Sequence, residues 1–302
     1  MKRILFIQNP AAGRRRHRLE KSFFKAFFTD TDNIDFAVTE AAGEASSLTY
    51  ERFNEFDVFV AIGGDGTVNE VGKVLIGTGK TLGIVPAGSG NGLARELGMD
   101  MNIRNAVQQI SLLNSALIDT ISVNSYPSLN VAGIGFEAEV AHLFKTLKKR
   151  GFPSYAKCVA SLISNYKPVE VEMEVNGERL SKKAFSLSFS NSRQFGNNVF
   201  NSPLAGVNDG LIDVSVIKPF PLILAPELSI RLFDRSLHKS WFYEVIKTEC
   251  TDILNSGELK WHIDGEPVIL HGPFKVEIKK QSLKVLVGNQ DLPRISQTPS
   301  EQ

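Results

Sequence analysis

Twice in the first third of the chain, an apolar run breaks into a glycine-rich turn and then into a helical pattern. Residues 57–62 (DVFVAI) lead into the turn 63–66 (GGDG), and residues 81–86 (TLGIVP) lead into the turn 87–91 (AGSGN). Short apolar strands that alternate with helices are typical of βαβ units with a parallel sheet. Because the carboxyl ends of parallel strands meet at one edge, the two turns imply one shared crevice.

The chain of 302 residues divides into two parts by its pattern. Residues 1–120 alternate predicted strands and helices and predict an α/β domain with a parallel sheet. Residues 121–288 carry mostly alternating apolar runs, which predict a β-rich, antiparallel second domain. The polar tail 289–302 is expected to be loose, and a return to the first domain stays open. The predicted strands are 3–8, 34–38, 57–62, 81–86, 169–175, 184–190, 211–217, 258–263, 273–279 and 283–287. The predicted helices are 18–28, 44–53, 137–166 and 221–247. The predicted hairpin turns are 176–177, 209–210 and 264–265.

Composition places the chain among ordinary globular proteins. Hydrophobic residues make up 42% and charged residues 22%, which excludes disorder, collagen and coiled coil for the bulk of the chain. A formal net charge of +1 gives no basic field for nucleic acid, although residues 1–30 carry eight Lys/Arg against two acidic residues and could meet an anion. Cys158 and Cys250 lack metal-ligand spacing and are expected to be reduced. Without a signal-peptide core or an apolar run of about 20 residues, we expect a cytoplasmic protein.

The turn 63–66 has the composition of a phosphate site. Glycines let the backbone approach an anion, and the free amides and dipole of the following helix favour negative charge. Asp65 is an acid where phosphate would sit, so we expect Mg²⁺ between Asp65 and a nucleotide phosphate. The alternative is a tight turn with Asp65 in a left-handed conformation. Thr67-x-x-Glu70 also fits a capping box, which would only close the helix end.

Two common nucleotide fingerprints fail at these turns. A Walker A loop needs Gly-x-x-x-x-Gly-Lys-Ser/Thr, but five residues separate Gly66 from Gly72, and Val74 follows Lys73. The Rossmann pattern fits neither turn, which removes the main support for hydride transfer. A third loop, 9–13 (NPAAG), ends the first predicted strand, and the arginines that begin at residue 14 could clamp phosphate or only form a solvated helix face.

Six sequence elements, in order, resemble the diacylglycerol kinase catalytic family, which includes sphingosine kinases and bacterial lipid kinases. They are Asn-Pro-x-x-Gly at 9–13, Gly-Gly-Asp-Gly-Thr-x-Asn-Glu-Val at 63–71, Pro-x-Gly-Ser-Gly-Asn at 86–91, Gly-Ile-Gly-Phe-Glu-Ala at 133–138, Asn-Asp-Gly-Leu-Ile-Asp-Val at 208–214 and Ile-Asp-Gly-Glu at 263–266. The resemblance covers nearly the whole chain. It implies an ATP- and Mg²⁺-dependent kinase acting on a lipid hydroxyl. The implied fold is an NAD kinase-like α/β domain that binds the nucleotide and a β-rich domain that supplies part of the lipid site, with the reaction in the cleft between them.

The resemblance also implies residue roles, position by position. Glu266 matches the family's candidate general base. We expect Asp65 to hold Mg²⁺ and Glu266 to act as base, but the sequence leaves these two roles open. The nucleotide side would be formed by Asn9, Gly13, Arg14, Gly63, Gly64, Asp65, Gly66, Thr67, Glu70, Gly88, Ser89, Gly90, Asn91 and Arg95.

The same resemblance extends to a metal site and to the headgroup of the substrate. Asp209 and Asp213, with Leu211 between them, match a structural metal site of bacterial members. Glu137 and Glu139 are candidates for contact with an amino-alcohol headgroup, although bacterial members tend to carry Asp at the first position. Bacterial diacylglycerol kinases usually have Asn-Asp, and sphingosine kinases Asn-Ala, where this chain has Asn-Gly at 91–92. The identity of the lipid therefore stays open.

The implied partners are a lipid substrate and a membrane surface, with no nucleic acid. We expect a cytoplasmic protein that is peripheral at the inner face of the membrane, with a homodimer suggested by the bacterial relatives. The apolar stretch 219–247 would line an acyl-chain cleft, rest on the membrane or pack in the core. The runner-up function is an NAD kinase, which shares a Gly-Gly-Asp-Gly loop. From another class, a catalytically silent lipid- or nucleotide-binding regulator also fits.

Overall fold

Four short apolar runs pair as parallel strands in the computed structural model, which describes residues 2–13, 19–24, 26–28, 33–147 and 151–288. The sheet order is β2-β1-β3-β4. Every residue of β1, β3 and β4 is buried, as expected for unbroken apolar runs in a parallel sheet. The strands are β1 (Ile4–Gln8), β2 (Ile34–Val38), β3 (Val58–Gly63) and β4 (Thr81–Pro86).

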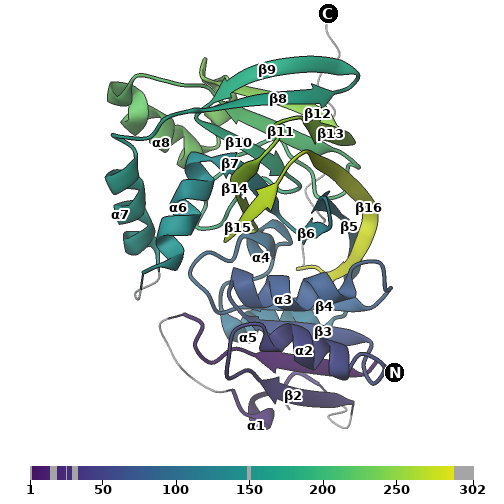
Figure 1. The fold of residues 1–302 in the computed structure, drawn as a ribbon. Coiled ribbons are helices and arrows are strands. Elements are labelled where there is room, and N and C mark those ends of the chain that lie inside the picture. Colours follow the sequence, from purple (N-terminus) through teal and green to yellow (C-terminus); the bar gives the residue numbers. More distant parts are fainter. Residues whose placement is uncertain (1, 14–18, 25, 29–32, 148–150, 289–302) are drawn as a thin grey trace, which may run out of the picture.

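Helices lie in the connections that follow the strands of this sheet. They are α1 (Lys21–Phe24), α2 (Glu44–Glu51), α3 (Asp65–Leu75), α4 (Gly92–Glu96) and α5 (Ile103–Ser111). α3 buries Val68, Val71 and Leu75 at helical spacing against β3 and β4, and α2 lies beside it (Figure 1). Of the predicted helix 18–28, the described residues form only the single turn α1.

The second part of the chain is an antiparallel β-sandwich. One sheet has six strands in the order β12-β11-β10-β7-β14-β15, and it faces β8, β9 and β13. Trp261 is fully buried between the layers, with ring centroids 5.6 Å from Phe189 and 5.2 Å from Phe274. The strands are β7 (Val131–Gly135), β8 (Val169–Val175), β9 (Glu178–Ala184), β10 (Ser186–Ser190), β11 (Ile212–Ile217), β12 (Tyr243–Thr248), β13 (Cys250–Ile253), β14 (Glu258–Ile263) and β15 (Glu266–His271). The predicted fold class is confirmed.

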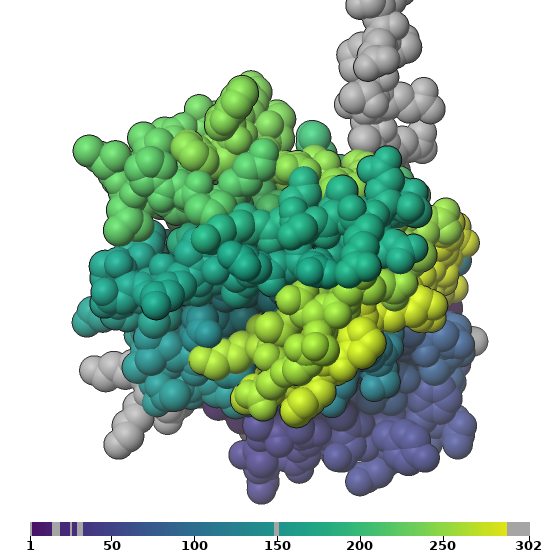
Figure 2. Space-filling model, turned by 45° about the horizontal axis from the view of Figure 1, so that its top comes forward, coloured from purple at the N-terminus to yellow at the C-terminus, as the bar shows by residue number. Residues whose placement is uncertain are grey.

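One long strand, β16 (Phe274–Leu286), connects the two parts. Its start pairs with β13, and its end pairs in parallel with β4. The strand β5 (Ser115–Val123) runs antiparallel along it. β5 also pairs with the short strand β6 (Tyr126–Ser128). Residues 273–279 and 283–287, predicted as two strands, are thus one strand with an irregularity between Lys279 and Leu283. Figure 2 shows this yellow segment between the purple-blue N-terminal part and the teal and green C-terminal part. Strand pairing therefore couples the two parts directly.

Two predicted helical stretches are divided in the structure. The stretch 137–166 forms α6 (Phe136–Lys145) and α7 (Phe152–Leu162). The stretch 221–247 forms the 3₁₀ turn η1 (Leu222–Leu224), α8 (Ala225–Asp234) and η2 (Leu237–Lys239). A helix over 243–247 was the wrong prediction, because these residues pair with β11 as β12. Among the described helices, none combines the length and apolar character needed to cross a bilayer.

Two of the three predicted hairpin turns are confirmed. Asn176-Gly177 joins β8 to β9, and Asp264-Gly265 joins β14 to β15, with all four residues at positive φ as such turns require. The prediction at 209–210 is wrong, because this Asp-Gly pair lies in the long connection 191–211 between β10 and β11. Of this pair only Gly210 has positive φ, and its N–H donates to Asp119 Oδ2 of β5 (2.8 Å).

Candidate active site

Three loops meet at the carboxyl ends of β1, β3 and β4: loop 1 (residues 9–13), loop 2 (63–66) and loop 3 (86–91). Asn9 of loop 1 donates from Nδ2 to Thr67 Oγ1 (3.1 Å) at the start of α3. A Cβ on Gly13 would lie 2.2 Å from Ala87 O, and one on Gly88 would lie 2.4 Å from Gly64 Cα. Glycine at 13 and 88 therefore lets the three loops touch through their backbones.

Asp65 ties loop 2 to loop 3. Its Oδ2 accepts the N–H of Asn91 (2.8 Å) and its Oδ1 accepts the N–H of Gly92 (2.7 Å). Burial raises the pKa of Asp65, and these two N–H donors oppose that shift. A carboxylate offers about four lone-pair sites, so Asp65 keeps capacity for a cation or a water. Asp65 can thus both shape the loops and hold Mg²⁺.

The start of α3 presents unpaired backbone donors. The helix begins at Asp65 after the N-cap Gly64, and no side chain caps it. Helix geometry leaves the N–H groups of Gly66 and Thr67 without intrahelical acceptors, and the helix dipole adds positive potential. The proposed capping box at Thr67 is not formed, because the helix starts two residues earlier.

The side chain of Glu70, in α3, contacts the start of α2. Its carboxylate accepts the N–H of Gly43 (2.9 Å) and the N–H of Ala45 (3.1 Å), at the first turn of α2. Glu70 therefore satisfies donors at the start of α2, and this engagement speaks against contact with a nucleotide.

Other predicted loop residues support the backbone of the loops. A Cβ on Gly63 would lie 2.5 Å from Thr67 Oγ1, and a Cβ on Gly90 would lie 2.6 Å from Asp65 Oδ2. Arg95 donates from Nε to Gly90 O (3.2 Å), so its guanidinium braces loop 3. Ser89 lies within loop 3 itself and is exposed. Arg14 lies outside the described residues.

The β14–β15 turn carries Glu266 from the second part to the start of α3. Glu266 Oε1 lies 3.9 Å from the point that a Cβ on Gly66 would occupy, and Glu266 Oε2 lies 3.9 Å from Lys145 Nζ. Asp264 fixes this turn, because its carboxylate accepts four hydrogen bonds of 2.7–3.1 Å. The donors are Ser128 Oγ and the N–H groups of Leu129, Asn130 and Val131.

A segment of the long connection 191–211 covers loop 3. Asn197 donates its N–H to Gly90 O (3.1 Å). A Cβ on Gly92 would lie 2.8 Å from Phe195 O and 2.9 Å from Asn130 Nδ2. The backbone of Phe195 and the side chain of Asn130 thus fill the space that a side chain at position 92 would need, and this packing accounts for glycine there.

An ion pair joins the two parts beside loop 3. Arg193 Nε donates to Glu96 Oε1 (2.9 Å), and the side chain of Glu96 is only 1% exposed. Burial raises the pKa of Glu96, and the guanidinium of Arg193 opposes the shift.

The two predicted headgroup residues lie in different surroundings. The side chain of Glu137 is 10% exposed and accepts from Ser188 Oγ (2.8 Å). Its Oε1 lies 3.3 Å from Nε2 of His262, which precedes the turn that carries Glu266. Glu139 instead pairs with Lys260 (2.9 Å) at the surface. The structure therefore places Glu137, and not Glu139, in the polar interior behind that turn.

The predicted metal ligands converge on a lysine. Asp213 Oδ1 and Asp209 Oδ2 lie 2.7 and 3.2 Å from Lys247 Nζ, and Leu211 donates its N–H to Asp209 Oδ1 (3.0 Å). Within the described ranges, no group of three or more His, Cys, Asp or Glu side chains is placed to hold a metal ion. The ammonium of Lys247 therefore already occupies the position between the two carboxylates that a structural metal ion would need.

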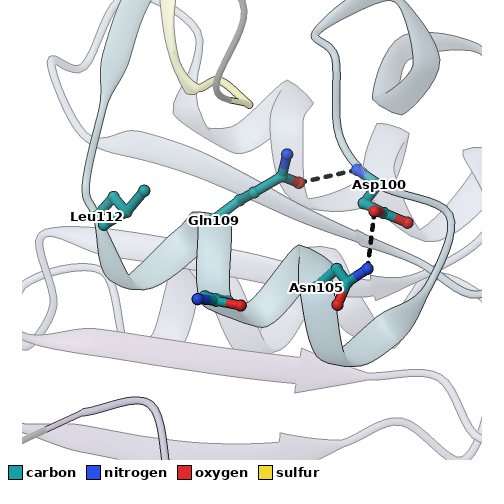
Figure 3. A pocket seen from close by; sticks show the side chains of 5 residues that line it. Asp100, Asn105, Gln109 and Leu112 are labelled. Atoms are coloured by element: carbon teal, nitrogen blue, oxygen red, sulfur yellow. Dashed lines mark hydrogen bonds between the residues drawn. The ribbon is translucent and has the colours of Figure 1, made fainter.

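A pocket of about 340 Å³ lies elsewhere, along α5 (Figure 3). Gln109 Oε1 accepts the N–H of Asp100 (2.8 Å) and Asn105 Nδ2 donates to Asp100 Oδ2 (2.9 Å), so three of its polar residues are bonded to one another. None of its lining residues was predicted from the sequence as a site residue, and none belongs to loops 1–3.

Sequence reasoning missed the contacts that bring the two parts together. The Asp-Gly pair at 264–265 predicted a turn, but gave no sign that Asp264 would anchor it to residues 128–131. The sequence also gave no sign that Arg193 would lie beside Glu96, which is 97 residues away in the chain. These residues are found only once the connection 191–211 is seen to pack on loop 3.

Two family models match the chain in succession. Residues 3–123 match the diacylglycerol kinase catalytic domain, and residues 130–287 match the YegS C-terminal NAD kinase beta sandwich-like domain. The first covers loops 1–3, and the second covers the turn with Glu266.

Curated relatives and solved structures agree with these matches. A protein of Bacillus subtilis named "Diacylglycerol kinase" is 29% identical over 72% of this chain and 74% of its own length. A protein of Pseudomonas putida named "Probable lipid kinase YegS-like" is 30% identical over 78% and 79%. The crystal structure of a diacylglycerol kinase from Bacillus anthracis covers 95% of this chain and 97% of its own, with a TM-score of 0.70 and 22% identity, which shows a shared fold.

Proposed function

The chain belongs to the diacylglycerol kinase catalytic family, and from this premise we propose that it transfers the γ-phosphate of ATP to the hydroxyl of a lipid. One observation carries the proposal: Glu266, from the second part, lies over Gly66 at the uncapped start of α3. A carboxylate that can accept a proton and backbone donors that can bind phosphate are thus brought within a few ångströms of each other.

The residues of loops 1–3 fit a magnesium nucleotide. Phosphate oxygens would accept from the N–H groups of Gly66 and Thr67, and the glycines leave room for that approach. Asp65 would hold Mg²⁺ through its remaining lone pairs, and the bound ion would offset charge on the phosphates during transfer. Asn9 orients Thr67 from the side of loop 1.

Glu266 would accept the proton of the lipid hydroxyl as its oxygen attacks the γ-phosphorus. The bond from that phosphorus to the β-phosphate oxygen breaks, and ADP leaves. Glu266 is half-exposed and therefore open to a substrate, while the four donors on Asp264 hold the turn in place. Transfer of phosphate asks mainly for such positioning.

We further propose that the protein works peripherally at the inner face of the cytoplasmic membrane. Support comes from large apolar side chains exposed along one stretch of the second part. Ile223 is 86% and Trp241 is 87% exposed, and the cations Arg235 and Lys239 are exposed between them in sequence. Apolar and cationic side chains together favour binding to an anionic lipid surface.

A homodimer remains a proposal supported by the family resemblance. Light scattering after size-exclusion chromatography tests it, because a dimer has twice the 33.3 kDa mass of the chain.

An acceptor panel tests the proposed activity. Labelled ATP and Mg²⁺ are supplied with detergent-dispersed diacylglycerol, sphingosine, ceramide or NAD. Label in the organic phase supports a lipid kinase and identifies its substrate class. Label on NAD alone favours an NAD kinase, and label nowhere favours a silent lipid- or nucleotide-binding regulator.

A further inference from the structure

Three oxygen atoms converge on the ammonium group of Lys247 in β12. They are Asp213 Oδ1 at 2.7 Å, Asp209 Oδ2 at 3.2 Å and the carbonyl oxygen of Leu204 at 3.2 Å. An ammonium has three N–H donors, so three acceptors match its capacity. Two carboxylates and one backbone carbonyl are also the ligand types that hard divalent cations prefer.

A hydrogen bond from Ser202 and the pairing of β11 with β12 hold Asp213 in place. Asp213 is 1% exposed, and its second oxygen accepts from Ser202 Oγ (2.8 Å). Lys247 and Asp213 are directly opposed in the β11–β12 register, so the sheet itself sets their approach. The ammonium of Lys247 thus lies between two carboxylates, one of them buried, and offsets their charge.

The cluster also lies where the two parts of the molecule are joined. Asp209 precedes Gly210, whose N–H donates to Asp119 Oδ2 of β5 (2.8 Å), while Asp119 Oδ1 accepts the N–H of Gln281 of β16 (2.7 Å). The acceptors around Lys247 thus belong to the same polar network as the strands that connect the two parts.

A divalent ion and Lys247 would need the same position. Oxygen ligands surround such ions at about 2.0–2.6 Å, so an ion bound by both carboxylates would displace the ammonium. Leu211, the third residue implied for a metal, donates its N–H to Asp209. The oxygen ligands are present, but the ammonium of Lys247 already occupies the position of the cation.

We propose that Lys247 replaces the structural metal ion implied for this position, so that this protein needs no divalent ion there. Removal of the ammonium would leave an oxygen-lined site that accepts Mg²⁺ or Ca²⁺. This proposal concerns the architecture of the second part and does not depend on the proposed kinase activity.

Lys247→Met tests the proposal, because methionine keeps an unbranched apolar side chain but removes the charge. Tm is measured without nucleotide, in EDTA and in millimolar Mg²⁺ or Ca²⁺, for the wild type, Lys247→Met and the control Lys218→Met. Lys218 lies directly after the end of β11 and pairs with Glu244 (3.4 Å) at the surface. We expect Lys247→Met to lose about 5 °C or more in EDTA, as for a broken buried pair, and to regain much of it with either ion. Addition of Asp213→Asn should abolish that recovery.

Metal analysis of the dialysed wild type gives a second readout that holds even if the variant does not fold. We expect less than a stoichiometric amount of any divalent metal and the same Tm in EDTA as in metal. One equivalent of metal whose removal lowers the Tm of the wild type would overturn the proposal. So would a Lys247→Met variant that melts no lower than Lys218→Met, or one whose loss neither ion recovers.

Discussion

Glu266 is the residue on which the proposed chemistry depends most. Glu266→Gln keeps the size and polarity of the side chain but removes its ability to accept a proton. We expect turnover to fall by about 10²–10⁴-fold, the usual contribution of a general base. ATP affinity should survive, because the nucleotide would be held by loops 1–3. Steady-state kinetics and calorimetric titration with ATP measure the two quantities.

Glu258→Gln is the matched control for that substitution. Glu258 lies at the opposite end of the same hairpin, exposed, with Oε2 3.7 Å from His271. Its substitution should leave turnover unchanged. If Glu266→Gln turns over like the wild type, Glu266 is not the base and Asp65 becomes the remaining candidate.

Arg193 neutralises a carboxylate that is almost fully buried. In Arg193→Met, the buried Glu96 loses its partner, and we expect the free energy of unfolding to fall by about 2–4 kcal/mol at pH 7.5. Burial already raises the pKa of Glu96, and without Arg193 it should rise further. The folded state then binds the proton more tightly than the unfolded state, so stability is lost as pH rises above the unfolded value of 4.5.

The deficit of Arg193→Met should therefore shrink as pH is lowered toward about 4.5, where Glu96 is protonated in the folded variant. Urea unfolding at several pH values measures it. Arg179→Met is the control, because Arg179 and Glu172 form an exposed pair (2.6 Å) worth less than about 1 kcal/mol. A deficit that does not change with pH would show that lost packing, and not the charge of Glu96, explains the effect.

Among the elements, η1 and the segment that follows η2 carry the proposed contact with lipid. The double variant Ile223→Ser/Trp241→Ser should bind anionic vesicles at least tenfold more weakly, since burial of one such side chain contributes about 1.5–3 kcal/mol. Tm should not fall, because both side chains are highly exposed. Vesicle sedimentation measures the binding.

Tyr50→Ser serves as the control, because Tyr50 is 77% exposed on α2, in the other part of the molecule (Figure 1). Equal vesicle binding by the wild type and the double variant would remove this surface from the proposal.

The elements that could be predicted from the sequence are those whose pattern is local. β2, β4, β8 and β14 have the predicted bounds, because each is an apolar or alternating run between turn residues. The division of 137–166 into α6 and α7, and the change from α8 to β12, were not predicted. Apolar residues dominate both stretches, and pairing with β11, far away in the sequence, decides that Tyr243–Thr248 is a strand.

For the whole molecule, the sequence predicted which loops would meet but not what holds them together. Loops 1–3 follow parallel strands, so their convergence follows from topology. The roles of Glu70 and Lys247 depend on partners that lie elsewhere, at the start of α2 and on β11 and its preceding connection. β16, predicted as two strands, is the element that joins the parallel sheet of the first part to one layer of the sandwich in the second.

The most direct test of the central claim is phosphate transfer from labelled ATP into an organic-phase lipid, with the Asp65→Asn/Glu266→Gln variant in parallel. We predict Mg²⁺-dependent label in lipid for the wild type and background label for the variant. Equal label with both proteins, or label only on NAD, would contradict a lipid kinase built on Asp65 and Glu266.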